Sequence, residues 1–156
     1  MKSTLLKATF ISGAMALVFA SASIAHSEST GIPEADARIA KMKELGGSMK
    51  AIAAVAKGEA EYSPALNAKA ETVKKIAMEM ASLFPEGSGG EKTRSKPEIW
   101  TKKAEFSAAI TDLQMASEKL VAAVATGDRA AIGPALGATG KTCGGCHKPF
   151  RTPKDH

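Results

Sequence analysis

Two cysteines and a histidine near the end of the chain have a spacing with a specific chemical use. Cys143, Cys146 and His147 form a Cys-x-x-Cys-His pattern. Such a pattern attaches a haem through two thioether bonds and ligates its iron with the adjacent histidine. On a helix these positions are i, i+3 and i+4, so all three side chains project from one face. A single flat macrocycle can therefore be bonded and ligated by the three residues together.

Three other uses of these residues have to be weighed against haem attachment. A dithiol redox pair would need the strand and helix alternation of a thioredoxin-like fold around it, which this sequence lacks. A zinc site would need four ligands, and the only other histidine nearby is His156, the last residue of the chain. A structural disulfide would leave His147 without a role. Haem attachment is therefore favoured over these three alternatives.

The N-terminus has the features of a secretory signal peptide. Lys2 and Lys7 precede an apolar run over residues 8–20, and small residues follow this run. The run is too short to cross a bilayer and anchor there comfortably, which disfavours an uncleaved membrane anchor. We therefore expect residues 1–25 to be removed and residues 26–156 to form one domain. Export to a bacterial periplasm agrees with the haem interpretation, because c-type haem is attached outside the cytoplasm.

Charge and composition disfavour two classes of function. Without Lys2 and Lys7, 19 of the 21 basic residues remain against 16 acidic ones, a formal charge of +3. No basic run is interleaved with aromatic residues, so a nucleic-acid partner is not expected. No histidine besides His147 is well placed as a general base, so an enzyme is not expected either. Aromatic residues make up only 4% of the chain, and a buried porphyrin would add apolar bulk.

The apolar periodicity of the mature chain predicts helices only. Apolar residues recur at three- and four-residue steps in four segments, separated by short loops and one longer polar connection over residues 86–96. The fourth segment contains Pro134, which should kink its first part. The predicted helices are residues 33–58, 64–84, 97–127 and 128–150. This pattern predicts an all-α fold, an antiparallel four-helix bundle.

Polar residues and glycines suggest where these helices begin and bend. Ser63 and Asp128 are placed as N-caps of the second and fourth helices. Ser95 and Glu98 have the spacing of a capping box at the start of the third helix. The pair Gly46-Gly47 interrupts the first helix without shifting its apolar period. We therefore expect a local bend or a close packing contact there, and no break.

Essentially the whole mature chain resembles the class II c-type cytochromes, the cytochrome c-prime family. The resemblance rests on a Gly-Lys-x-Cys-x-x-Cys-His-x-x-Phe-Arg motif over residues 140–151, at the end of the fourth predicted helix. Class I cytochromes, by contrast, carry the shorter Cys-x-x-Cys-His pattern near the N-terminus. Residues 38–43 and 97–100 resemble the corresponding segments of the low-spin, six-coordinate branch of the family. The resemblance thus points to that branch.

The resemblance also implies roles for the residues of the C-terminal motif. Cys143 and Cys146 would hold one covalent haem c, and His147 would be the proximal iron ligand. Arg151, one turn beyond His147, resembles the family arginine that lies beside this histidine and is a candidate haem-site residue. From the sequence alone, Arg151 could equally be a solvated charge that favours the C-terminal dipole of the helix.

One position in the first helix separates two functions in this family. In the five-coordinate branch an apolar residue, four positions after an arginine, blocks the distal face, whereas in the low-spin branch that residue is a methionine. Here Met42 follows Arg38 by four, so the resemblance implies that Met42 ligates iron and that Arg38 can contact a haem propionate. From spacing alone Met42 could simply fill the core, with Met49 as the reserve ligand, and Arg38 could be an ordinary exposed arginine.

The sequence therefore predicts a periplasmic mono-haem cytochrome that carries single electrons through a low-spin His/Met-ligated haem. The alternative is a five-coordinate protein of the same family that binds or scavenges nitric oxide or carbon monoxide. Redox proteins, docking weakly and transiently, are the expected partners, with no membrane association once the signal peptide is removed. The sequence is compatible with a homodimer through the first two helices and also with a monomer. Ala51, Ala53 and Ala54 fit either a dimer interface or an ordinary surface.

Overall fold

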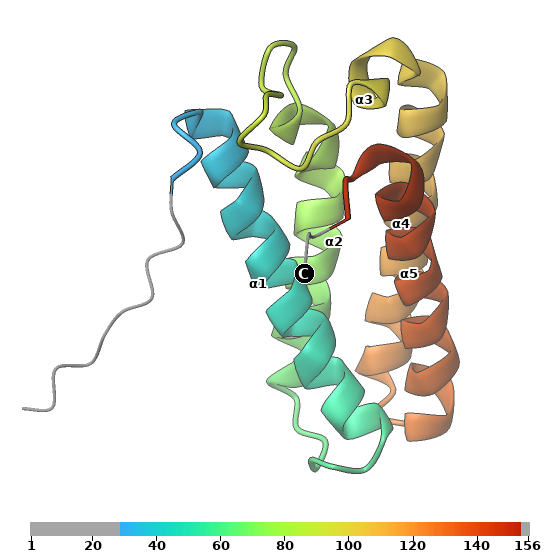
Figure 1. The fold of residues 1–156 in the computed structure, drawn as a ribbon. Helices are drawn as coiled ribbons and strands as arrows, with labels where there is room; N and C mark the ends of the chain where they lie inside the picture. The colour runs from blue at the N-terminus through green and yellow to red at the C-terminus, as the bar shows by residue number, and fades with distance from the viewer. Residues whose placement is uncertain (1–28, 154–156) are drawn as a thin grey trace, which may run out of the picture.

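Four long helical segments follow one another along the chain (Figure 1). The structure is a computed structural model that describes residues 29–153, so the predicted signal peptide lies outside the described residues. The helices are α1 (Pro33–Ala56), α2 (Leu66–Glu79) with the 3-10 turn η1 (Met80–Leu83), α3 (Glu98–Thr101), α4 (Lys103–Ala125) and α5 (Arg129–Phe150). Within residues 29–153 the only extended pairing is an isolated bridge between Ser95 and Arg151. The predicted all-α class is confirmed.

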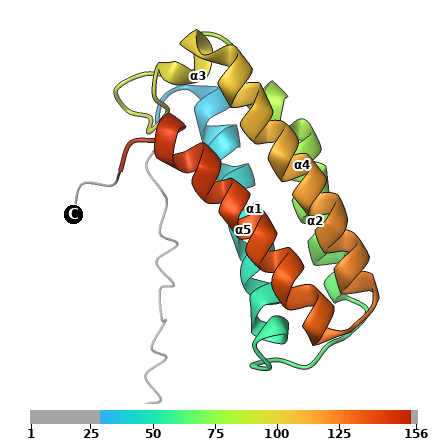
Figure 2. The same cartoon turned by 90° about the vertical axis from the view of Figure 1, so that its right-hand side faces the viewer.

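The long helices form a four-membered ring of antiparallel neighbours. Helix α1 packs against α2, α2 against α4, α4 against α5, and α5 against α1. In Figure 2, α5 crosses in front of α1, and α4 runs beside them. The predicted four-helix bundle is confirmed. One end of the bundle gathers the start of α1, the connection over residues 84–97 and the end of α5 (Figure 1). Among the described helices, none has the length and apolar character needed to cross a membrane.

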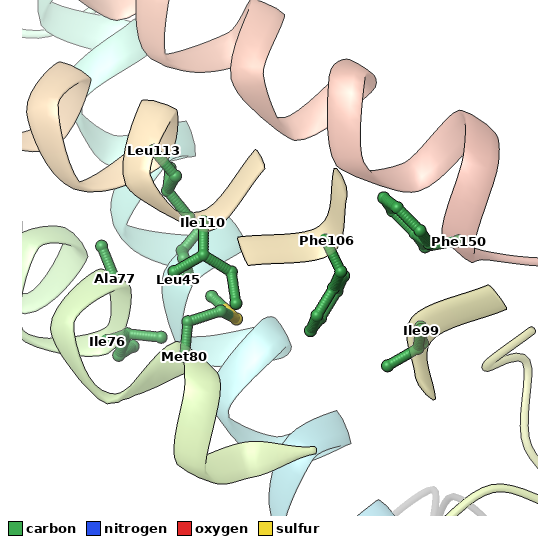
Figure 3. Packing of buried hydrophobic residues seen from close by; sticks show 9 residues of the cluster. All are labelled: Leu45, Ile76, Ala77, Met80, Ile99, Phe106, Ile110, Leu113 and Phe150. Carbon is green, nitrogen blue, oxygen red and sulfur yellow. The ribbon is translucent and has the colours of Figure 1, made fainter. Parts of the chain in front are cut away.

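The core of the bundle divides into two clusters of buried side chains. The closed-end cluster lies toward the short loops, and its members are Ile52, Val55, Leu66, Ala70, Val73, Leu120, Val124 and Ile132. The site-end cluster lies toward the connection over residues 84–97, as Figure 3 shows. Its members are Leu45, Ile76, Ala77, Met80, Ile99, Phe106, Ile110, Leu113 and Phe150. All four long helices contribute to each cluster.

Two of the expected helix features can be checked directly. The Asp128 carboxylate accepts a hydrogen bond from the Ala130 N–H at 2.9 Å, so the predicted N-cap of α5 is confirmed. Helix α1 runs without a break through Gly46-Gly47. The expected absence of a break is therefore confirmed. A Cβ atom added at either glycine would meet nothing within 4 Å, so of the two expected alternatives the close packing contact is wrong. Helix α5 likewise continues through Pro134.

The two serine caps predicted for the other helices are wrong. Helix α2 begins after a turn in which the Ser63 carbonyl accepts the Leu66 N–H at 2.9 Å, and Ser63 makes no side-chain cap. Ser95 makes no cap either, because its hydroxyl accepts a hydrogen bond from the guanidinium of Arg38. A tertiary contact between residues far apart in sequence has taken the place of the local one.

The helix predicted over residues 97–127 is interrupted. Lys102 has φ −112° and ψ 52°, outside the helical region, and it separates α3 from α4. The apolar period could not reveal this break. Ile99 and Phe106, on either side of it, are both buried and stand seven residues apart, a spacing that also fits an uninterrupted helix.

Candidate haem site

The attachment residues lie in the last three turns of α5, at the site end of the bundle. Cys143, Cys146 and His147 are all half-buried, and both cysteines are free thiols. The two cysteine side chains pack against the site-end cluster. The Cys143 thiol donates a hydrogen bond to the Thr139 carbonyl at 3.4 Å. The predicted constellation is therefore assembled on one helix and is directed toward the core.

The surroundings of these residues favour their neutral forms. Burial raises the pKa of the Cys143 thiol. Burial, and then the neighbouring Cys143, raises the pKa of the Cys146 thiol. Burial also lowers the pKa of His147, and the positive charges of Arg151 and Arg94 lower it further. A neutral imidazole is the form that can coordinate a metal ion, so the electrostatics suit a ligand at His147.

Helix α1 presents two methionines to the same cluster. Met42 and Met49 are half-buried and pack against the site-end cluster, as Cys143 and Cys146 do. The structure thus brings the candidate distal ligand and the attachment cysteines to one core region from two neighbouring helices. Across residues 29–153 no three His, Cys, Asp or Glu side chains gather as a metal site, and the zinc alternative finds no ligand set in that range.

Arg38 is buried, with only 5% of its surface exposed, so its interpretation as an ordinary exposed arginine is wrong. Its Nη1 donates to the Leu83 carbonyl at 2.9 Å and to the Ser88 hydroxyl at 3.1 Å. Its Nη2 donates to the Ser88 carbonyl and to the Ser95 hydroxyl, both at 3.0 Å. The guanidinium also lies 4.5 Å from the centre of the Phe84 ring. Four polar contacts and one aromatic contact therefore hold this side chain.

The charge of Arg38 has no carboxylate partner within 4.0 Å among the described residues. Burial lowers the pKa of its guanidinium, and the more distant charge of Glu34 opposes this effect. Buried charges in proteins are ordinarily paired, because desolvation is costly. All of its protein acceptors are neutral oxygens, and an anionic group would complete the site. A haem propionate is such a group, so Arg38 and the thiol–thiol–imidazole set of α5 fit a covalently attached haem.

The C-terminal turn of α5 is surrounded by basic groups. Arg151 caps the helix, with its N–H donating to the His147 carbonyl at 3.0 Å, and its side chain is exposed. Burial lowers the pKa of Arg151, and the neighbouring Arg94 lowers it further. Arg94 itself donates to the Thr152 carbonyl through Nε at 2.9 Å and Nη2 at 2.6 Å. The positive charge of Arg151 thus lowers the pKa of His147 and also lies at the C-terminal end of α5. Its position is compatible with a residue beside the histidine and with a charge that favours the helix dipole.

Sequence reasoning missed the residues of the connection that complete this region. Ser88, Ser95 and Phe84 contact Arg38 across 45 or more positions. Arg94 lies close enough to His147 to affect its pKa. These residues belong to a stretch without apolar period, so no pattern in the sequence linked them to the site. Ser95 was assigned only a local capping role, and its long-range contact with Arg38 had no signal in the sequence.

Known proteins match most of this chain in sequence. A family model described as Cytochrome C' matches residues 34–151. A cytochrome c' from Pararhodospirillum photometricum is 38% identical over 111 residues, which cover 70% of this chain and 89% of the relative. A cytochrome c-556 from Agrobacterium tumefaciens (strain apple 185) is 35% identical over 126 residues, covering 77% of this chain and 95% of the relative. Relatives under both names therefore match most of the chain.

A solved structure agrees with the fold described above. It is the nitric oxide complex of a point mutant of cytochrome c prime from Alcaligenes xylosoxidans. The two chains superpose with a TM-score of 0.72 and 28% identity, and the match covers 78% of this chain and 95% of the other. Family, relatives and fold agree with one another. The chain belongs to the cytochrome c' and c-556 family of class II c-type cytochromes, whose members are haem proteins and not enzymes.

Proposed function

We propose that this protein is a carrier of single electrons, with one haem c held by Cys143 and Cys146 and ligated by His147 and Met42. The observation that carries the proposal is the meeting of Met42, from α1, and the attachment cysteines, from α5, at the site-end cluster. A methionine there would supply a second iron ligand from a helix that neighbours the one carrying His147. Low-spin ligation in both oxidation states keeps the rearrangement on electron transfer small.

Each of the four residues has a definite task in this proposal. Cys143 and Cys146, both free thiols on one helix, would hold the haem through two thioether bonds. His147, kept neutral by burial, ligates the iron through its free ring nitrogen. The Met42 thioether favours the ferrous state, because a soft sulfur ligand stabilises it. The haem itself supplies the iron that takes up and releases the electron.

Arg38 and Arg151 are proposed to act through charge. The four terminal N–H donors of Arg38 already have protein acceptors, which leaves Nε–H as the donor for a propionate. The propionate would in turn neutralise a buried cation. Arg151 would keep the proximal imidazole from taking up a proton, because its positive charge lowers the pKa of His147.

Gas binding is the second candidate, and the comparisons give it specific support. The matched structure from Alcaligenes xylosoxidans holds nitric oxide, and the relatives include proteins named cytochrome c' as well as cytochrome c-556. In that case Met42 would only cover the distal face, and a diatomic ligand would reach the iron. The two functions differ in one bond, between iron and the Met42 sulfur.

Replacing Met42 with Ala tests this bond. The wild-type protein is expected to give low-spin spectra in both oxidation states and slow carbon monoxide binding. Met42→Ala should become high-spin in the ferrous state and bind carbon monoxide at least about tenfold faster, because no internal ligand has to leave first. Met49→Ala is the matched control, since it removes another half-buried methionine from the same cluster. A high-spin, five-coordinate ferrous wild type would contradict the electron-carrier proposal and favour gas binding.

The setting of this function is also a proposal. We infer a periplasmic location from the predicted signal peptide and from family membership. The partners would be redox proteins that dock transiently beside the haem edge. A homodimer stays a prediction for this chain. A cytochrome c' of the same fold shows ligand-controlled dimer dissociation, so native mass measured with and without carbon monoxide is the measurement to make.

A further inference from the structure

The side chain of Ser95 is hydrogen-bonded to α1, whereas the backbone next to it is hydrogen-bonded to the segment just after α5. The Ser95 hydroxyl accepts a hydrogen bond from Nη2 of Arg38 on α1 at 3.0 Å. On the other side, the carbonyl of the preceding residue, Arg94, accepts the N–H of Thr152 at 2.9 Å, just beyond α5. One short segment therefore contacts both the helix that carries Met42 and the end of the helix that carries the attachment motif.

Further hydrogen bonds link this segment to the end of α5. The Lys96 N–H donates to the Phe150 carbonyl at 3.0 Å. The Arg94 guanidinium donates to the Thr152 carbonyl, and the Thr152 hydroxyl donates to the Arg94 carbonyl at 3.1 Å. The Lys96 ammonium donates to the Lys148 carbonyl at 3.3 Å. These bonds do not involve the Ser95 side chain, so its link to α1 can be removed without touching them.

A second path of aromatic rings joins the same two places. The Arg38 guanidinium lies on the Phe84 ring, 4.5 Å from its centre. Phe84 meets Phe106 edge to face with ring centres 4.9 Å apart, and Phe106 meets Phe150 in the same way at 5.1 Å. Figure 3 shows Phe150, from α5, lying beside Phe106 at one edge of the site-end cluster. The polar and the aromatic paths both begin at Arg38 and both end at the last turn of α5.

The ends of these paths lie next to the candidate iron ligands. Arg38 stands one helical turn before Met42, and Phe150 stands three residues after His147. Helices α1 and α5 contact each other less than the other neighbouring long helices do. The connection over residues 84–97 therefore supplies much of the linkage between the distal and the proximal side of the site.

We propose that Ser95 is a positioning residue, which through Arg38 couples the distal face of α1 to the proximal turn of α5. This inference rests on the proposed haem site and assigns a further residue to it. The coupling fixes how α1 stands opposite His147. It thereby controls how readily an external ligand reaches the iron, whether or not Met42 occupies the sixth position.

The haem-loaded Ser95→Ala protein tests the coupling. The change removes one acceptor of a charged donor, whereas Ser95→Thr keeps the hydroxyl. We expect carbon monoxide to bind ferrous Ser95→Ala about tenfold faster than wild type, and hydrogen exchange at the Thr152 amide to rise about tenfold. Ser95→Thr should restore both values. Ser82→Ala is the matched control, because the Ser82 hydroxyl makes only a local bond to the Glu79 carbonyl.

The outcomes separate this proposal from the proposed function. If Ser95→Ala changes neither rate by more than about twofold, the coupling is wrong, while a low-spin wild-type spectrum would leave Met42 ligation standing. If the wild type is five-coordinate, Met42 ligation is wrong, and the Thr152 exchange rate still decides the coupling. Should Ser95→Ala fail to load haem, the isosteric pair Ser95→Val and Ser95→Thr, which differ by the hydroxyl alone, tests the coupling by the same two rates, and equal rates in this pair would overturn the proposal.

Discussion

The two ends of the bundle bury their apolar side chains to different degrees. In the closed-end cluster six of the eight members have no exposed surface, whereas in the site-end cluster only Ala77 of nine has none. The site-end cluster is also bordered by half-buried apolar residues that include Met42, Met49, Cys143 and Cys146. The apolar side chains of the closed end are thus shielded from solvent almost completely by the protein alone. The site end is a core whose remaining contacts would be supplied by a haem.

The two ends are also held together by different interactions. The closed end relies on aliphatic packing between helices and on a local cap at Asp128. The site end relies on contacts between residues far apart in sequence, including the four hydrogen bonds of the Arg38 guanidinium. A mutation at the closed end should therefore change stability alone. A mutation at the site end should change the haem as well.

The largest effect is expected from matched leucine truncations at the two ends. Leu120 has no exposed surface at the closed end, and Leu45 is 7% exposed at the site end. Leu120→Ala should lower the free energy of unfolding by about 3–5 kcal/mol, since the cavity cannot collapse. Leu45→Ala should cost about 2–3 kcal/mol and also alter the haem spectrum. Urea unfolding, followed by both circular dichroism and the haem band, measures both effects.

The comparison between the ends depends on the spectra of these two variants. Leu120→Ala should leave the haem spectrum and the carbon monoxide binding rate as in the wild type. If Leu120→Ala shifts the haem band as much as Leu45→Ala does, the two clusters act as one core, and the distinction between a closed end and a site end fails.

A smaller effect is expected from the cap of α5. Asp128→Ala removes the carboxylate that accepts the Ala130 N–H and should cost about 1 kcal/mol, with no change in the haem spectrum. Asp128→Asn is the matched control, because asparagine caps about as well as aspartate. Thermal unfolding of the three proteins measures the difference. Equal losses in both variants would mean that the negative charge, and not the cap, is what matters.

The closed end was the easier half to predict from the sequence. Its core residues recur at regular three- and four-residue spacing on the helices, and the Asp128 cap contacts a residue only two positions away. Local signals of this kind can be read without knowledge of the fold. The cap predicted at Ser95 failed for the opposite reason. Ser95 has good capping spacing, but a buried guanidinium 57 positions away is the stronger donor for its hydroxyl.

At the site end, the sequence predicted the individual candidate residues but not the contacts that link them. The attachment motif is local, so Cys143, Cys146 and His147 could be found from spacing. Met42 could be found only through the resemblance, because a methionine on an inward stripe has no signature of its own. The role of the connection over residues 84–97 depends on long-range pairing with α1 and α5, and nothing in the sequence of an aperiodic loop encodes a partner.

The smallest effect is expected from the hydrogen bonds that hold the start of α1 at the site end. The Asp36 carboxylate accepts hydrogen bonds from the Ser29 hydroxyl and from the N–H and hydroxyl of Thr30. These bonds lower the pKa of Asp36. As pH falls, the unfolded chain therefore takes up this proton before the folded chain does. The contribution of Asp36 is complete above its unfolded pKa and is lost as pH falls through its folded pKa.

Asp36→Asn tests this contribution, because an amide does not titrate. Between about pH 5 and about pH 3 the wild type should lose more of its urea midpoint than the variant does. At about pH 5 the variant should already be slightly less stable, since the charge-assisted bonds are gone. Because Asp36 stands two residues before Arg38, loss of this anchor should also raise hydrogen exchange at the start of α1 and leave α5 near Asp128 unchanged. Equal acid sensitivity in the two proteins would show that the start of α1 is held by packing alone.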